Sequence, residues 1–196
     1  GSEVSDENSE SVSKYLDIIN SSAAKMSDMV DALLSYARIG RTLPSFTEFS
    51  LKDCVSTASG MLASIVNDTE ACIKNETPNV MISGDFDLIV RLLQNLIGNA
   101  VKYCKPDTPP SIIISAKPSK EKVTLFIEDN GIGIDADHVN SIFELFKRLH
   151  GEGEYEGLGV GLATCKRIAE IHGGSIKLDT QYKDGARFII DLPNEV

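Results

Sequence analysis

Apolar residues recur at intervals of three and four along the first part of the chain. They are Leu16, Ile19, Ala23, Met26, Val30, Leu33 and Ala37. This spacing is typical of the apolar seam of a helix that packs against another helix. Ser11 or Ser13 is a suitable N-cap, and Gly40 is a suitable end. The spacing therefore predicts a long amphipathic helix over residues 13–40, after a flexible, acidic and serine-rich leader over residues 1–12.

A single helix of this kind leaves its seam in water, so we expect a second helix to cover it. That helix would come from an upstream part of the same protein or from a second subunit. The alternative is that the seam packs on the domain that follows it.

The remainder, residues 46–196, alternates between strand and helix patterns. Strands are predicted over residues 46–49, 70–74, 111–117, 121–128, 174–180 and 186–192. Helices are predicted over residues 50–65, 86–103, 137–146 and 160–171. Short loops join the strands within 111–128 and within 174–192, which makes much of the sheet antiparallel. The pattern predicts an α/β sandwich with helices on one face of a mixed sheet.

Length and charge limit the classes of function. A chain of 196 residues is long enough for one ordinary domain and an appendage. Its 29 acidic and 19 basic residues give a net charge of −10, which argues against a nucleic-acid-binding surface. No apolar run approaches the ~18 residues of a membrane span, so we expect no membrane contact. Four cysteines without a CxxC pair predict buried, reduced thiols and a cytoplasmic location.

A polar stripe interrupts the otherwise apolar helix over residues 86–103. Its members Arg91, Asn95, Asn99 and Lys102 fall on one side of the helix. Asparagine is a poor helix former, and its amide oxygen is a suitable ligand for Mg²⁺. Lys102 can neutralise a phosphate one turn away. The stripe predicts a binding site, the alternative being an ordinary solvated face.

Two glycine-containing loops add to this candidate site. Asp129 ends a predicted strand and is followed by Gly131 and Gly133, so its carboxylate can accept a hydrogen bond from an exocyclic amine such as that of adenine. An ordinary turn is the alternative. Further along, Gly157, Gly159 and Gly161 lead into a helix, which predicts a phosphate site at the helix N-terminus. The loop lacks the GK[ST] of a Walker P-loop and the preceding strand of a Rossmann motif.

The order of these motifs resembles that in the catalytic and ATP-binding domain of two-component sensor histidine kinases, members of the GHKL ATPase superfamily. Residues 95–103 resemble the N box, 129–133 the first glycine box, 143–146 the F box and 157–162 the second glycine box. The resemblance covers residues 46–193 and implies a GHKL-type α/β sandwich. The helix over residues 13–39 is similar to the second helix of the family's dimerisation and phosphoacceptor hairpin, which implies a homodimer.

The resemblance implies ATP and Mg²⁺ as cofactors and assigns a role to each motif. Asn95, Lys102 and Arg148 would be catalytic, and Asn99 with Asn95 would hold the Mg²⁺. The remaining nucleotide-binding residues would be Tyr103, Asp129, Gly131, Gly133, Gly157, Gly159, Gly161 and Leu162. Residues 149–156 would form a mobile lid. The chain departs from the family pattern at Leu145 and at Leu158. It also departs at Ala186, a position where a Ser or Thr hydroxyl is common.

The family's H box, H-E/D-x-x-x-P, is absent from this sequence, and His138, His150 and His172 do not match it. We therefore expect the first hairpin helix to lie upstream in a longer protein. The implied function is transfer of the γ-phosphoryl of ATP to a histidine of that hairpin, for relay to a response regulator. The alternatives are a nucleotide-binding or regulator-docking module without catalysis, and an anti-sigma-type serine kinase, a family without the hairpin. Asn95 stands where ATP-hydrolysing branches carry Glu, so efficient hydrolysis is not expected.

Overall fold

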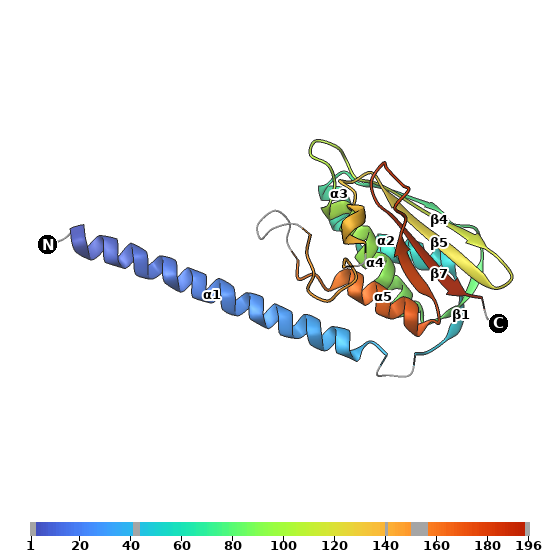
Figure 1. The fold of residues 1–196 in the computed structure, drawn as a ribbon, viewed down its shortest axis with the longest axis horizontal. Coiled ribbons are helices and arrows are strands. Elements are labelled where there is room, and N and C mark those ends of the chain that lie inside the picture. The colour runs from blue at the N-terminus through green and yellow to red at the C-terminus, as the bar shows by residue number, and fades with distance from the viewer. Residues whose placement is uncertain (1–2, 41–43, 140, 150–156, 195–196) are drawn as a thin grey trace. The chain divides into compact units, whose positions relative to one another are not determined.

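The computed structural model describes residues 3–40, 44–139, 141–149 and 157–194. The chain divides into two compact units, residues 1–38 and residues 39–196. The first unit is the single helix α1 (Glu3–Arg38), shown in Figure 1. Within the described part of the chain, no helix combines the length and the apolar character that crossing a membrane requires.

Helix α1 begins ten residues before the expected start at residue 13, so residues 3–12 are helical and not a flexible leader. Ser11 and Ser13 lie inside the helix, not at its N-cap. The predicted end is confirmed, because α1 stops at Arg38 and Gly40 has a φ of 81°.

The second unit contains a five-stranded sheet in the order β2-β4-β5-β7-β6. Strand β2 pairs with β4 in parallel, and the other pairs are antiparallel, so the predicted mixed sheet is confirmed. The strands are β2 (Cys72–Glu76), β4 (Ser111–Pro118), β5 (Lys122–Asp129), β6 (Ser175–Leu178) and β7 (Arg187–Pro193).

Helices α2 (Leu51–Met61), α4 (Phe86–Lys102) and α5 (Gly161–Ile171) lie on one face of this sheet, as Figure 1 shows. Central helix α4 packs its apolar side against the alternating apolar residues of β4 and β5. The fully buried side chains include Leu92, Leu96, Ile97, Ile112, Ile114, Leu125 and Ile127. This arrangement confirms the predicted α/β sandwich.

The structure differs from the predicted elements in three places. The helix expected over 50–65 is two helices, because the helical conformation is interrupted at Leu62, which lies between α2 and α3 (Ala63–Asp68). Strand β3 (Met81–Gly84), which pairs with β1 (Thr47–Ser50), was not predicted because four residues carry too little pattern. The helix expected over 137–146 is wrong: a short 3₁₀ helix, η1 (Ala136–His138), is followed by turns. Phe146 there has a φ of 63°, which a right-handed helix does not allow.

The connector, residues 44–46 immediately before β1, is held by Asp85 and His172. Asp85 Oδ2 accepts a hydrogen bond from the Ser45 backbone N–H at 3.1 Å, while its Oδ1 caps α4 by accepting from Leu88 N–H at 3.1 Å. The Phe46 ring stacks on His172 with ring centroids 5.0 Å apart. His172 Nδ1 lies 2.8 Å from the Ile168 carbonyl oxygen and must donate to it, so Nε2 accepts from Asp85 N–H at 3.0 Å. His172 is therefore a buried, structural histidine.

The four cysteines differ in exposure and should differ in reactivity. Burial was expected for all four, but it holds only for Cys54 and Cys165, while Cys72 is exposed and Cys104 is half-buried. Burial and the nearby charge of Asp87 raise the pKa of Cys54 to about 12, and burial raises the pKa of Cys165 as well. Because the thiolate is the reactive form, we expect an aromatic disulfide reagent to modify Cys72 first, Cys104 more slowly, and the buried pair only after unfolding.

Mass spectrometry of peptides taken at increasing labelling times measures this order. Cys72→Ser serves as the control and should remove the fastest phase only. Modification of all four thiols at one rate in the native protein would contradict the burial of Cys54 and Cys165.

Candidate functional site

A pocket lies between the end of α4, the loop after β5 and the start of α5. Its empty volume is about 630 Å³, part of which is open to solvent. It is lined by Asn99, Tyr103, Asp129, Ile132, Gly133, Ile134, Ile142, Lys147, Arg148, Leu149, Leu162, Ala186 and Phe188. Asn99 of the polar stripe, the Asp129 loop, the residues that flank the F box and Leu162 of the second glycine box thus meet at one cavity.

Asp129 occupies the last position of β5 and is 8% exposed. Its Oδ1 accepts two hydrogen bonds, from the backbone N–H groups of Gly131 and Ala186, each at 2.9 Å. Within the described chain, Oδ2 accepts no hydrogen bond, so it is the oxygen that remains for a ligand. Burial raises the pKa of Asp129, against the opposing effects of those two N–H groups and of Lys105.

The glycines of the Asp129 loop are required for two different reasons. A side chain at Gly131 would overlap the carbonyl oxygen of Tyr103, the residue that ends α4. Gly133 has a φ of 77°, which favours glycine, and a Cβ there would lie 3.2 Å from the Gly185 carbonyl oxygen. Ile132 N–H donates to the Tyr103 carbonyl at 3.0 Å. Close packing on the end of α4 therefore brings Asp129 and Tyr103 to the same pocket.

Some of the predicted site residues lie outside the pocket lining. Lys102 Nζ donates to Tyr103 Oη at 2.9 Å, and a Cβ at Gly157 would lie 2.9 Å from the same Nζ. A Cβ at Gly161 would lie 3.4 Å from Asn95 Oδ1. The polar stripe of α4 therefore continues beneath the second glycine loop. The residues outside the lining are Asn95, Lys102, Gly131, Gly157, Gly159 and Gly161.

The F-box segment is fixed to the second glycine loop by backbone contacts. Phe146 N–H donates to the Gly159 carbonyl at 2.9 Å. Gly159 has a φ of 72°, and a Cβ there would lie 2.7 Å from the Lys147 carbonyl oxygen. This junction brings Lys147 and Arg148 to the pocket wall. Residues 150–156 of the expected mobile lid lie outside the described residues.

Sequence reasoning missed the apolar wall and one cation of the pocket. Ile132, Ile134 and Phe188 face the cavity, as does Lys147. Alternate residues of β7, Phe188 among them, are buried in the structure, but nothing local in the sequence distinguishes a residue that faces the core from one that faces a cavity. The apolar wall beside the buried carboxylate of Asp129 is suited to a planar, amine-bearing ring.

Comparison with known proteins identifies the family. The profile described as histidine kinase-, DNA gyrase B-, and HSP90-like ATPase matches residues 84–196. Cyanobacterial phytochrome A of Nostoc sp. is 34% identical over 168 residues, 86% of this chain and 22% of that protein. Sensor protein RstB of Escherichia coli is 31% identical over 179 residues, 89% of this chain and 40% of that protein. The chain thus spans less than half the length of either relative.

A solved structure agrees in fold. Histidine kinase ThkA in complex with response regulator protein TrrA aligns with a TM-score of 0.71 and 23% identity, over 93% of this chain and 51% of that chain. The matched profile contains α4, the Asp129 loop and the second glycine loop, which confirms the resemblance drawn from the motifs. The chain therefore belongs to the family of histidine kinase-, DNA gyrase B- and HSP90-like ATPases, and its ATPase domain is of the type found in sensor histidine kinases.

Proposed function

We propose that residues 46–196 bind Mg-ATP and transfer its γ-phosphoryl group to a histidine of a dimerisation hairpin, from which it passes to an aspartate of a response regulator. The observation that carries this proposal is the buried Asp129 carboxylate in an apolar-walled pocket, with one oxygen that accepts no hydrogen bond from the described residues. Family membership of the ATPase domain supports it. Since the reaction consumes ATP, we expect the domain to work in the cytoplasm.

At the adenine end, Asp129 Oδ2 accepts a hydrogen bond from the exocyclic amine. Ile132, Ile134 and Phe188 provide apolar contacts to the ring, and Gly133 lets the ring lie close to the backbone. Tyr103 contacts the ribose or a phosphate. Gly131 supports the contact indirectly, because its N–H orients the carboxylate.

At the phosphate end, the N-terminus of α5 has no side-chain cap among the described residues, so its first N–H groups, which have no partner within the helix, and its partial positive charge are suited to phosphate. Gly157, Gly159 and Gly161 allow the phosphates to approach the backbone, and Leu162 packs beside them. Lys102, beneath this loop, neutralises phosphate charge, and Arg148 stabilises the γ-phosphoryl group in transfer. Mg²⁺ suits the hard amide oxygen of Asn99, with Asn95 one turn away, and supplies further charge neutralisation when bound.

Positioning and charge neutralisation carry the chemistry. The imidazole nitrogen that attacks has its own lone pair, so no protein base is needed, and the bond from phosphorus to the ADP oxygen breaks as the bond to nitrogen forms. The amide of Asn95 cannot act as a general base, so hydrolysis by water is disfavoured. His172 is not the acceptor, since both of its ring nitrogens bond to the backbone.

We further propose that α1 is the second helix of the hairpin and that its apolar seam meets a helix of the intact homodimer. Leu16, Ile19, Met26 and Val30 of that seam are exposed. The second proposed partner is a response regulator. The solved complex of ThkA with response regulator protein TrrA supports this choice.

Transfer in trans tests the proposal. This chain is expected to bind ATP without labelling itself, and to label a separately supplied hairpin that carries the phosphoacceptor histidine. Without the tether, an effective concentration of about 1 mM is lost, so at ~10 μM hairpin the rate should be about 100-fold below the tethered rate and rise with hairpin concentration.

Incubation with γ-labelled ATP and an acid-stability assay of the product measure this. The hairpin alone and a hairpin without its histidine are the controls. Acid-stable label would indicate a serine kinase, and ATP binding without any transfer would indicate a non-catalytic module. Acid-labile label on this chain alone would reveal an acceptor in its own sequence.

A further inference from the structure

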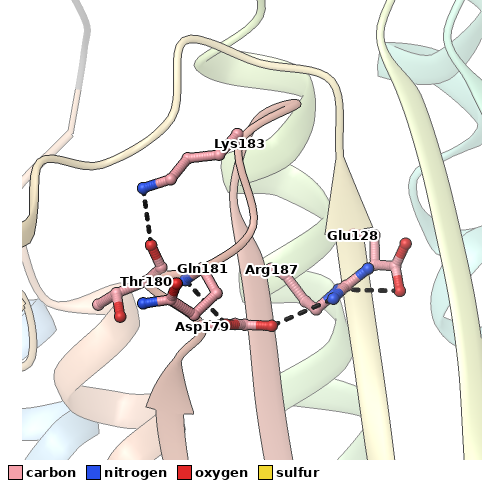
Figure 2. Close-up of polar contacts among 6 residues, drawn as sticks. All are labelled: Glu128, Asp179, Thr180, Gln181, Lys183 and Arg187. Carbon is pink, nitrogen blue, oxygen red and sulfur yellow. Dashed lines mark hydrogen bonds and ion pairs between the residues drawn. The ribbon is translucent and has the colours of Figure 1, made fainter.

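Arg187, the first residue of β7, lies at the centre of a polar cluster beside the pocket (Figure 2). It faces Glu128 across the antiparallel β5–β7 pair, with Arg187 Nε 3.0 Å from Glu128 Oε1. The two groups form an ion pair, although the N–H is not aligned for a hydrogen bond. On its other side, Arg187 Nη1 donates to Asp179 Oδ2 at 3.1 Å. One guanidinium thus joins β5 to the end of β6.

The loop between β6 and β7 is folded around the same guanidinium. Asp179 Oδ1 accepts from Gln181 N–H at 3.0 Å, and this bond, followed by Arg187, holds the pKa of Asp179 below its usual range. The Arg187 guanidinium carbon lies 4.2 Å from the centre of the Tyr182 ring, a cation–π distance. Lys183 Nζ donates to the Thr180 carbonyl at 2.9 Å, as Figure 2 also shows. Arg187 therefore holds the start of this loop through Asp179 and Tyr182, while Lys105 Nζ donates to the Asp184 carbonyl at 3.1 Å nearer to residue 186.

This loop ends at the residue that orients Asp129. Ala186 N–H donates to Asp129 Oδ1, and Asp129 N–H donates to the Ala186 carbonyl, each at 2.9 Å. Glu128 precedes Asp129 in the chain, and Arg187 follows Ala186. The Glu128–Arg187 ion pair therefore lies at the end of the β5–β7 pairing, directly beside the Asp129–Ala186 hydrogen bonds. A shift of Arg187 moves Ala186, and with it the N–H that fixes Oδ1.

We infer that Arg187 is a positioning residue for nucleotide recognition: by clamping Glu128 and Asp179 it holds the Ala186 N–H on Asp129 Oδ1, which leaves Oδ2 directed to the adenine amine. The inference rests on the proposed adenine contact of Asp129. Arg187 itself does not line the pocket. Its planar guanidinium spans two carboxylates and an aromatic ring at once, which a lysine ammonium cannot do.

Arg187→Gln tests the inference, with Lys122→Gln as the matched control. Lys122 Nζ forms an ion pair with Asp191 Oδ2 at 2.9 Å between the same two strands, at the far end of the ladder. Both variants thus lose one cation that joins β5 to β7. Only Arg187→Gln loses it at the end of the strand pair where Ala186 bonds Asp129. Calorimetry with Mg-ADP should give an affinity about three- to tenfold lower for Arg187→Gln, since a hydrogen bond to a charged group is weakened. Arg187→Lys should lie in between.

The pH dependence of ADP binding separates positioning from a general loss of stability. Ala186 N–H favours the ionised carboxylate, so its displacement raises the pKa of Asp129, and binding should fail at a higher pH on the acid side. The other groups that act on Asp129 are Lys105, the Gly131 N–H and Tyr182. The first two have no contact with Arg187 or Lys122, whereas Tyr182 loses its cation–π partner in Arg187→Gln and keeps a cation in Arg187→Lys.

The acid limb is the pH range over which ADP affinity falls on acidification. The inference is supported if this range lies at higher pH in Arg187→Gln than in the wild type and is unchanged in Lys122→Gln. ADP affinity and acid limb equal to those of the wild type in Arg187→Gln would overturn it while leaving the proposed function intact. Equal losses in both variants, tracking their melting temperatures, would also overturn it. Failure of the wild-type chain to bind ADP would overturn the proposed function and this inference with it.

Discussion

Asp129→Asn is expected to lower the affinity for Mg-ADP by about ten- to a hundredfold, the loss of a hydrogen bond to a charged acceptor. The structure gives a specific reason. Gly131 N–H and Ala186 N–H both point at Oδ1, so the amide oxygen of an asparagine must stay at that position. Its NH₂ group then replaces Oδ2 and meets the adenine amine donor to donor.

Calorimetry at pH 7 measures this loss, with Asp137→Asn as the control. Asp137 is an exposed carboxylate in the segment after the same loop and does not line the pocket, so its variant loses the same charge and should bind normally. Because burial raises the pKa of Asp129, wild-type affinity should start to fall at a higher pH than the ~3.9 of an ordinary aspartate would give. Unchanged ADP affinity in Asp129→Asn would remove the adenine contact from the proposed function.

Gly185→Ala is expected to destabilise the domain by ~3 kcal/mol or more and to abolish nucleotide binding. A Cβ at this position would lie 2.7 Å from Asp129 Oδ1 and closer still to the Asp129 carbonyl oxygen. Relief requires β5 and β7 to separate, because these obstacles are backbone and a fixed carboxylate, not the end of a flexible side chain.

Urea unfolding of the variant measures the stability change, with Gly60→Ala as the control. Gly60 lies in α2, and a methyl group added there would have nothing within 4 Å, so alanine should stabilise the domain by ~0.5 to 1 kcal/mol. A Gly185→Ala protein as stable as the wild type would contradict the close approach of β7 to Asp129.

Local patterns were sufficient for most of the fold and for part of the site. Helix α4 and the strand pairs β4–β5 and β6–β7 have strong periodicity or short connections, and their predicted ends lie within two residues of the observed ones. The helix predicted after Asp135 is wrong because Val139, Ile142, Phe143 and Phe146 have helical spacing without forming a helix. The backbone contact of Phe146 with Gly159 imposes a turn instead, and such tertiary contacts override propensity.

The support of the site was not predictable because it depends on residues far apart in sequence. Asp129 was singled out from its loop, but its partner Ala186 is 57 residues away, and the Glu128–Arg187 pair follows only from the β5–β7 register. A sequence pattern identifies residues with the right chemistry. It does not reveal which oxygen of a carboxylate is already occupied.

The cap of α4 has a thermodynamic consequence for the connector. Asp85 binds Ser45 through one oxygen and the first turn of α4 through the other, and His172 accepts the Asp85 N–H. The conformation of the connector and that of the first turn of α4, the helix that bears Asn95 and Asn99, are therefore coupled through Asp85. Removing the Ser45 N–H, as Ser45→Pro does, increases the conformational freedom of the Asp85 side chain and weakens the cap, so the effects of Ser45→Pro and Asp85→Ala on stability should be non-additive. The free energy that holds the connector in place is thus shared with the helix that reaches the nucleotide.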